Sequence, residues 1–203
     1  KTMTYSSAIF DTGQESLENA QLAKYASMVD QMGVVSGDHV LEIGCGWGGF
    51  AEYAAKEHGL KVTCLTISKE QLKYAQDRIN AAGLKEMVNF KLQDYRDETG
   101  VYDGIASIEM FEAVGEKYWP SYFETVYNRL KPGANATLQI ITVQHARYEI
   151  YRKSVDFIQK YIFPGGMLPS QIVMSEQVEK EVIMVVKSKE FVESYRQTLR
   201  SWH

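Results

Sequence analysis

A glycine-rich corner near residue 44 carries the residue types that point most directly to chemistry. The apolar stretch that ends at Ile43 runs into Gly44, Gly46 and Gly48, and then into residues that can start a helix. Because glycine has no Cβ, the backbone can turn tightly there and approach a ligand, and the following helix offers unpaired N–H groups. This pattern predicts a cofactor site of the nucleotide-binding type.

The strand expected after this corner narrows the choice of cofactor. A dinucleotide-binding unit would carry an Asp or Glu about 20 residues further on, at a strand end, to hold a ribose hydroxyl. The expected strand, residues 61–67, has Thr66 near its end instead, and we expect Thr66 to contact the cofactor. Gln71 lies three residues after Ser68, so it either contacts the cofactor or completes a capping box.

Polar side chains also follow the ends of other expected strands. Glu112 stands in an otherwise apolar stretch, where an unpaired carboxylate would be costly, so we expect a functional role. The alternative is that Glu112 caps a helix that starts near Glu116. Asp94 and Tyr95 follow a strand end, which favours contact with the cofactor over an ordinary loop. The histidines show no metal-ligand spacing, and we expect no metal.

Alternating helices and strands must position these residues. The hydrophobic pattern predicts a mainly parallel sheet covered by helices on both faces, with ligands at the carboxyl ends of the strands. The expected strands are residues 39–43, 61–67, 88–92, 102–108 and 136–142, and the expected helices are residues 17–32, 49–58, a segment that opens at Ser68, and 118–130. A turn is expected at residues 131–133.

Length and composition favour a single α/β domain over residues 1–203. The chain is 45% hydrophobic and has a formal net charge of −4, which argues against a general nucleic-acid binder. Its two cysteines provide no disulfide framework, so a cytoplasmic location fits best. No apolar run is long enough to cross a bilayer, so any contact with the inner membrane would be peripheral.

Two segments read as additions to the sheet. Residues 1–36 are expected to form an amino-terminal helical lid, and residues 144–172 a substrate-pocket insertion, a second helical lid after the fifth strand. The insertion is rich in aromatic residues and ends in a rigid turn, so it could roof an apolar pocket. Its basic residues form either a solvated face or a contact for anionic headgroups, and they are Arg147, Arg152, Lys153 and Lys160.

Several separate motifs resemble one known family of enzymes. They are Tyr5-Ser-Ser-Ala-Ile-Phe10, Leu41-Glu-Ile-Gly-Cys-Gly-Trp-Gly-Gly49, Leu65-Thr-Ile-Ser-Lys-Glu-Gln71, Gln93-Asp-Tyr-Arg-Asp97, Phe111-Glu-Ala-Val-Gly115, Tyr161-Ile-Phe-Pro-Gly-Gly-Met-Leu-Pro-Ser170 and Tyr195-Arg-Gln-Thr-Leu199. In this order they resemble the cyclopropane-fatty-acyl-phospholipid synthases and mycolic acid cyclopropane synthases. That resemblance implies a Rossmann-like class I methyltransferase that uses S-adenosylmethionine. Members often start before the Tyr5 motif and continue past the Tyr195 motif, so the domain is expected to be incomplete at both ends.

The resemblance also implies where the ligands bind. The implied cofactor-binding residues are Tyr5, Ser6, Gly44 and Gly46 at the methionine end, Thr66 and Gln71 at the ribose, Asp94 and Tyr95 at the adenine, and Glu42 and Ile108 at neighbouring strand ends. The implied substrate-binding residues are Tyr161, Phe163, Pro164, Gly165 and Gly166.

The implied catalytic residues are Glu112, Gln139 and Tyr195. In the family, the glutamate helps hold a bicarbonate ion together with a tyrosine, which Tyr195 matches, and a histidine on the fifth strand. Gln139 stands at the place of that histidine, and a glutamine neither titrates near neutral pH nor carries positive charge. Ala113 and Ser7 depart from the usual histidine and cysteine. Bicarbonate binding is therefore an open question at the level of sequence.

The expected reaction is transfer of a methyl(ene) group to the cis double bond of an unsaturated acyl chain of a phospholipid at the membrane surface, forming a cyclopropane ring. An aromatic pocket would keep water from the lipid cation. The alternatives are a methyl- or methylene-branched product, a class I methyltransferase acting on a soluble small molecule, and a non-catalytic protein that binds cofactor or lipid. A homo-oligomer is compatible with the sequence.

Overall fold

A five-stranded parallel sheet forms the centre of the molecule. In the computed structural model, which describes residues 2–180 and 183–202, the strands are β1 (His39–Ile43), β2 (Lys61–Thr66), β3 (Val88–Leu92), β4 (Tyr102–Ile108) and β5 (Leu130–Gln139). Their order is β3-β2-β1-β4-β5, and every neighbouring pair is parallel. The strand order reverses between β1 and β4, which is the place where open α/β sheets bind ligands.

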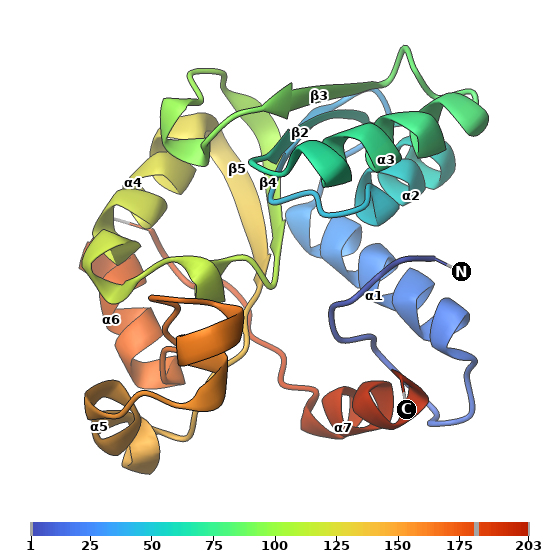
Figure 1. Cartoon of the computed structure of the whole chain (residues 1–203). Coiled ribbons are helices and arrows are strands. Elements are labelled where there is room, and N and C mark those ends of the chain that lie inside the picture. Colours follow the sequence, from blue (N-terminus) through green and yellow to red (C-terminus); the bar gives the residue numbers. More distant parts are fainter. Residues whose placement is uncertain (1, 181–182, 203) are drawn as a thin grey trace.

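Helices cover both faces of this sheet (Figure 1). On one face lie α1 (Leu17–Met32), α2 (Gly49–His58) and α3 (Lys69–Ala81), and they share a hydrophobic core with β1 and β2. On the other face lie α4 (Trp119–Arg129) and α6 (Gln171–Lys180), which contribute to a second core. The predicted Rossmann-like α/β fold is confirmed.

The burial pattern of α4 explains why this segment is helical. Trp119, Tyr122, Phe123 and Val126 are buried and recur at helical spacing, so one face of the helix packs on the sheet. The ring of Phe111 lies among them, with its centroid 5.3 Å from that of Trp119 and 5.0 Å from that of Tyr122. This aromatic cluster fixes the segment that leads from β4 to α4.

The fifth strand begins and ends earlier than expected. We expected a turn at residues 131–133 and a strand over 136–142, but β5 runs through the turn residues and stops at Gln139. The register between β4 and β5 shifts near the start of the pair, so the extra residues form an irregularity, and an edge strand tolerates the proline. β5 stops early because the backbone N–H of Ile141 donates to the carboxylate of Glu112.

A helical segment follows β5, where the substrate-pocket insertion is expected. It consists of α5 (His145–Lys153) and a π-helical turn (Ile158–Ile162), and it leads through Pro169 into α6. The backbone N–H of Val143 donates to the carbonyl of Pro169 at 2.9 Å, so the two ends of the insertion meet. No helix among residues 2–180 and 183–202 is long and apolar enough to span a bilayer.

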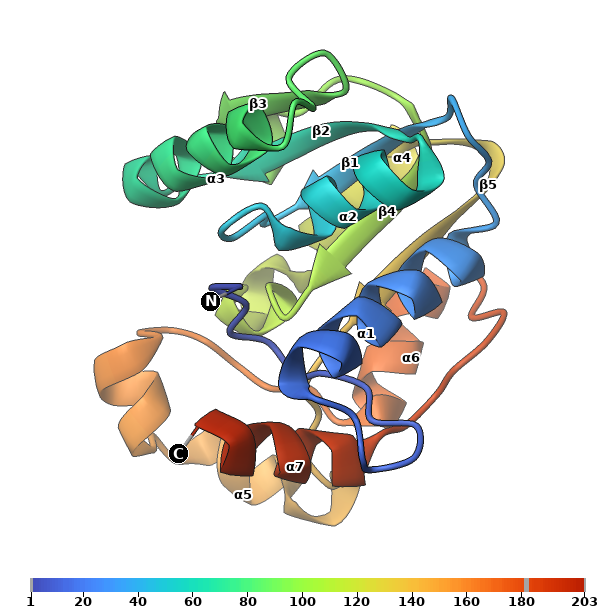
Figure 2. The ribbon, with the colours of Figure 1, turned by 90° about the vertical axis from the view of Figure 1, so that its right-hand side faces the viewer.

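The last helix, α7 (Val192–Trp202), returns to the amino-terminal segment and lies beside α1 (Figure 2). The hydroxyl of Thr198 accepts a hydrogen bond from the backbone N–H of Ala8 at 3.0 Å, and Ser194 accepts one from Phe10 at 3.0 Å. The expected helical lid at the amino terminus is thus an irregular segment bound by α7, followed by α1. The segment is irregular because its backbone groups bond to side chains of α7.

Candidate active site

The glycine corner adopts a backbone that only glycine accommodates easily. Gly44, Gly46 and Gly48 have φ angles of +80°, +50° and +78°. A Cβ added to Gly44 would lie 2.6 Å from the Cγ of Met110, so the corner also packs closely against the segment after β4. The turn places the start of α2, at Gly49, directly after the corner, as the sequence predicts.

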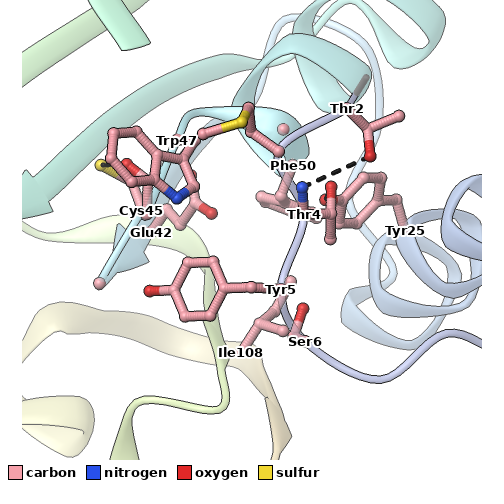
Figure 3. Close-up of a pocket in the computed structure, with 14 residues that line it drawn as sticks. Thr2, Thr4, Tyr5, Ser6, Tyr25, Glu42, Cys45, Trp47, Phe50 and Ile108 are labelled. Carbon is pink, nitrogen blue, oxygen red and sulfur yellow. Dashed lines mark hydrogen bonds between the residues drawn. The ribbon is translucent and has the colours of Figure 1, made fainter. Parts of the chain in front are cut away.

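A pocket opens at this corner (Figure 3). Of the residues predicted to bind the cofactor, those that line it are Tyr5, Ser6, Glu42, Gly44, Gly46 and Ile108. They come from the amino-terminal segment, the end of β1, the corner and the end of β4. The structure therefore brings together residues that are far apart in the sequence. Their roles in binding stay predictions.

Glu42 lies buried at this pocket. The thiol of Cys64 donates to its Oε2 at 3.6 Å, and burial raises the pKa of the Glu42 carboxyl well above its usual range. A buried carboxyl group needs polar partners, and a ligand with hydroxyl or ammonium groups would supply them.

Thr66 and Gln71 are linked to Tyr5 at the edge of the pocket. The Thr66 hydroxyl donates to Oε1 of Gln71 at 3.1 Å, and Nε2 of Gln71 donates to the hydroxyl of Tyr5 at 3.3 Å. Ser68 caps α3 by accepting from the backbone N–H of Gln71, but its own N–H donates to Thr66. The interpretation of Gln71 as the second half of a capping box is therefore wrong, because its side chain bonds elsewhere.

Asp94 and Tyr95 lie after β3 and outside the residues that line this pocket. The Asp94 carboxylate accepts from the backbone N–H of Arg96 at 2.9 Å and pairs with its guanidinium at 2.7 Å, which lowers the pKa of Asp94. The ring of Tyr95 packs edge-on against Tyr122, with 5.5 Å between the ring centroids. Their contact with adenine stays a prediction.

Glu112 has the environment of a functional carboxylate. Burial raises its pKa to about 7, the nearby charge of Glu109 adds to this rise, and the N–H of Ile141 at its Oε1 opposes it. Its Oε2 is buried and has no protein partner among the described residues. The alternative of a helix cap is wrong, since the carboxylate bonds across to the segment after β5. An orphaned buried oxygen points to a partner that binds there.

Gln139 is buried and fully used by the protein itself. Its Nε2 donates to the carbonyl of Ser7 at 3.1 Å and to Oε1 of Glu109 at 2.7 Å. A primary amide has two N–H groups, and both are taken. The residues at this place therefore do not fit bicarbonate, because Gln139 has no donor left for it and a carboxylate already lies there.

Tyr195 on α7 faces the same region. Burial raises the pKa of its hydroxyl, and the charges of Glu109 and Glu112 raise it further. The structure thus brings the predicted catalytic residues Glu112, Gln139 and Tyr195 to one end of the sheet, around a carboxylate that the sequence analysis did not single out.

The glycine turn of the insertion, at Gly165 and Gly166, contacts Glu112 through its backbone. The N–H of Met167 donates to the carbonyl of Glu112 at 2.9 Å, and a Cβ on Gly166 would lie 2.8 Å from that oxygen. Gly165 lies in the same turn, with its carbonyl near Gly115. Tyr161, Phe163 and Pro164 are exposed instead. These side chains are therefore not part of the hydrophobic core, and their contact with an acyl chain stays a prediction.

Comparison with known proteins decides the family. A family model described as mycolic acid cyclopropane synthetase matches residues 1–203. This chain belongs to the mycolic acid cyclopropane synthetase family. The resemblance inferred from the motifs is confirmed.

Relatives in this family include methyltransferases and a cyclopropane synthase. The tuberculostearic acid methyltransferase UfaA1 of Mycobacterium tuberculosis is 40% identical over 210 residues, which cover 100% of this chain and 49% of the relative. The cyclopropane-fatty-acyl-phospholipid synthase of Escherichia coli K12 is 39% identical over 202 residues, which cover 99% of this chain and 50% of the relative. The chain spans about half the length of these curated relatives.

Solved structures of the family share the fold. The mycolic acid cyclopropane synthase CmaA1 complexed with SAH and CTAB has a TM-score of 0.90 at 28% identity, covering 99% of this chain and 74% of that one. The cyclopropane synthase MmaA2 of Mycobacterium tuberculosis has a TM-score of 0.89 at 27% identity, with the same coverage of both chains. The expected class, S-adenosylmethionine-dependent methyltransferases, is that of the family.

Two charged residues that lie beside the candidate site, Lys24 and Glu109, were not identified from the sequence. Lys24 is fully buried in α1, and its Nζ donates to the hydroxyl of Ser6 at 2.7 Å. Burial lowers its pKa to about 7, and the carboxylates of Glu109 and Glu42 oppose this. Lys24 follows Ala20 by one helical turn on the buried face, which was a readable signal. Glu109 follows a strand end in an apolar stretch, the same signal that identified Glu112.

Proposed function

We propose that this protein transfers a methyl(ene) group from S-adenosylmethionine to the double bond of an unsaturated acyl chain of a phospholipid. The observation that carries the proposal is the buried Oε2 of Glu112, which has no partner among the described residues. Glu112 follows Met110, whose side chain packs against Gly44 in the glycine corner. A cofactor pocket beside carboxylates suits a reaction that develops positive charge.

The proposed cofactor site uses the residues at the corner. Tyr5, Ser6 and the glycines would hold the methionine end, and Thr66 and Gln71 the ribose. The link from Thr66 through Gln71 to the Tyr5 hydroxyl supports this, because it joins the two proposed ends of the site. Asp94 and Tyr95 would contact the adenine from the end of β3.

When bound, the cofactor supplies an electrophilic methyl group on a sulfonium sulfur. The chain's own residues then have two tasks, which are to keep water away from the developing lipid cation and to accept a proton. Water exclusion matters because a cation on an acyl chain would otherwise be captured by water. The rings of Tyr5 and Trp47, which line the pocket, would also stabilise the cation.

A branched product is the second candidate, and Gln139 is the observation that favours it. A glutamine that bonds within the protein offers no titratable group of its own at the reaction centre. Loss of a proton from a chain carbon would then yield a methyl-branched chain with a double bond, and a hydride shift followed by loss of a proton from the transferred methyl group would yield a methylene-bearing chain. The relative named tuberculostearic acid methyltransferase, at 40% identity, is consistent with such an outcome.

The exposed side chains of the insertion support action at a membrane surface. Ile150, Val155 and Phe157 are 73%, 74% and 65% exposed, and Lys153 and Lys160 are exposed beside them in sequence. Apolar side chains flanked by lysines suit peripheral binding to a bilayer with anionic headgroups. The proposed place of action is the cytoplasmic face of the inner membrane.

The experiment that tests the function supplies methyl-labelled S-adenosylmethionine and vesicles of phospholipids with cis-monounsaturated chains to the whole protein. Mass spectrometry and NMR then identify the labelled lipid. Ring protons would support cyclopropane formation, and label in a branched methyl or methylene group would support the second candidate.

Two outcomes would contradict both candidates. Label in a soluble small molecule, with none in lipid, would favour a soluble substrate. Binding of S-adenosylhomocysteine without turnover of any unsaturated lipid would favour a non-catalytic protein.

A further inference from the structure

Glu109 adopts an unusual backbone conformation at the end of β4. Its φ is +48°, and among the described residues only Met3 shares a positive φ without being glycine. Such a conformation is strained for a residue with a side chain and persists where the surroundings impose it. The backbone N–H of Glu109 donates to the carbonyl of Gln139 at 2.8 Å, which ties this strained residue to the end of β5.

The strain places a carboxylate between three parts of the chain. Oε1 of Glu109 accepts from the backbone N–H of Ser7 at 2.8 Å and from Nε2 of Gln139 at 2.7 Å. Lys24 is the cation that acts on it, since its charge lowers the pKa of Glu109, while burial raises that pKa more strongly. Glu109 is thus a mostly buried carboxylate whose pKa lies above its usual range, which makes it a better proton acceptor than an exposed carboxylate.

Glu109 also lies with the other groups of the candidate site. Its charge raises the pKa values of both Glu112 and Tyr195, so the three groups lie within electrostatic range of one another. The adjacent residue Ile108 lines the cofactor pocket, and so does Ser6, the neighbour of Ser7. The carboxylate therefore lies where the amino-terminal segment, β4 and β5 meet beside the pocket.

A separate anion has no place in this arrangement. Both N–H groups of Gln139 are used, and a bicarbonate ion would lie against the two carboxylates of Glu109 and Glu112. Like charges at short range disfavour each other. The family resemblance implies a bound bicarbonate ion at this place. In this protein the carboxylate of Glu109 occupies it.

We propose that the carboxylate of Glu109 is the proton acceptor of the reaction and takes the place of bicarbonate. The inference rests on the proposed function. The sulfur–methyl bond breaks as the double bond forms a new carbon–carbon bond to the methyl carbon, which leaves a cation on the lipid. The electrons of a C–H bond next to or on the transferred carbon then close the ring or form a double bond, and the proton passes to Glu109 and later to water.

The neighbours of Glu109 are positioning residues for this step. Ser7 and Gln139 each donate a hydrogen bond to one carboxylate oxygen, Oε1, which leaves Oε2 for the proton. Gln139 then needs no charge, because its role is to orient the carboxylate of Glu109, which is the base.

The test compares the wild-type protein with Glu109→Gln, Glu109→Gly and the matched control Asp103→Asn. Asp103 lies at the opposite end of β4 and bonds to Lys131 and to the backbone of His39. In buffer depleted of carbon dioxide, we expect wild type and Asp103→Asn to form labelled lipid at rates that added bicarbonate does not change. Glu109→Gln should form product at least 100-fold more slowly while binding S-adenosylhomocysteine within about twofold of wild type.

Glu109→Gly separates chemistry from folding. Glycine accepts a positive φ, so this variant should fold at least as well and leave a space at Gln139. Added bicarbonate should restore part of its turnover. A Glu109→Gln rate within threefold of wild type, or a wild-type rate that falls without bicarbonate and returns with it, would overturn the proposal.

A binding measurement keeps this inference distinct from the proposed function. Carbon-13 NMR of labelled bicarbonate, in the presence of S-adenosylhomocysteine, should show binding to Glu109→Gly and none to wild type. Binding to wild type, or to neither protein, would overturn the role of Glu109. Absence of lipid product from wild type would instead count against the proposed function, and the NMR result would still decide which group occupies this place.

Discussion

Gly44 has two structural roles, since it adopts a positive φ and it also leaves room for the side chain of Met110. Gly44 and Gly83 have similar φ angles, +80° and +72°, but a Cβ on Gly44 would meet Met110 at 2.6 Å, while one on Gly83 would meet nothing within 4 Å. An alanine would therefore strain the backbone at both positions, but it would clash with a neighbouring side chain only at Gly44.

We expect Gly83→Ala to lose about 1 to 2 kcal/mol of stability with unchanged affinity for S-adenosylhomocysteine. Gly44→Ala should lose at least that much and also bind the ligand at least tenfold more weakly, because the corner must shift. Thermal unfolding and isothermal titration calorimetry measure the two effects. Equal affinities for the two variants would show that the corner does not hold the cofactor.

Predictability also differs between single residues. Glu112 could be selected from sequence because a lone carboxylate in an apolar stretch must find a partner. Glu109 meets the same criterion, but its pairing with Gln139 depends on how β4 and β5 end beside each other. The sequence therefore indicates that a carboxylate in this stretch has a functional role, but it does not indicate which of the two bonds to Gln139.

At the scale of elements, α7 and the amino-terminal segment stabilise each other through buried polar contacts. The Thr198 hydroxyl accepts from the backbone N–H of Ala8, and α7 also carries Tyr195. Loss of the hydroxyl would leave a buried N–H without a partner, which costs about 1 to 3 kcal/mol.

We expect Thr198→Val to weaken the docking of α7 and to increase hydrogen exchange in α7 and around Ala8, while exchange in β1 stays unchanged. Ser201→Ala, on the exposed side of α7, is the control and should leave exchange near wild type. Exchange that rises equally throughout the sheet would contradict a local role for this contact.

The elements themselves were largely predictable. The helices at residues 17–32 and 49–58 and the strands at residues 39–43 and 88–92 follow from local periodicity and glycine stops, and the structure has them at those bounds. The bounds of β5 were not, because its early end depends on a hydrogen bond from Ile141 to Glu112, a residue on another segment.

At the scale of the whole molecule, exposed apolar side chains gather on the insertion. We expect Phe157→Ser to weaken binding to vesicles with anionic lipids by about tenfold, since a buried aromatic ring contributes about 1.5 to 3 kcal/mol. Val35→Ser, at a residue 67% exposed outside the insertion, is the matched control and should bind like wild type.

Vesicle sedimentation measures this binding at two salt concentrations. Binding that depends on lysines should weaken as salt rises, because exposed charges are screened. Equal losses for Phe157→Ser and Val35→Ser would show that the insertion is not the membrane contact.

The sequence by itself determined the fold class, the family, the glycine corner and the importance of the strand ends, because each depends on residues close together in the chain. The tertiary structure decided which side chains meet. The bond of Lys24 to Ser6, and the hydrogen bonds of Gln139 to Ser7 and Glu109, join segments whose contact depends on strand register and helix docking. Burial then sets their charge states, and burial is a property of the packed molecule.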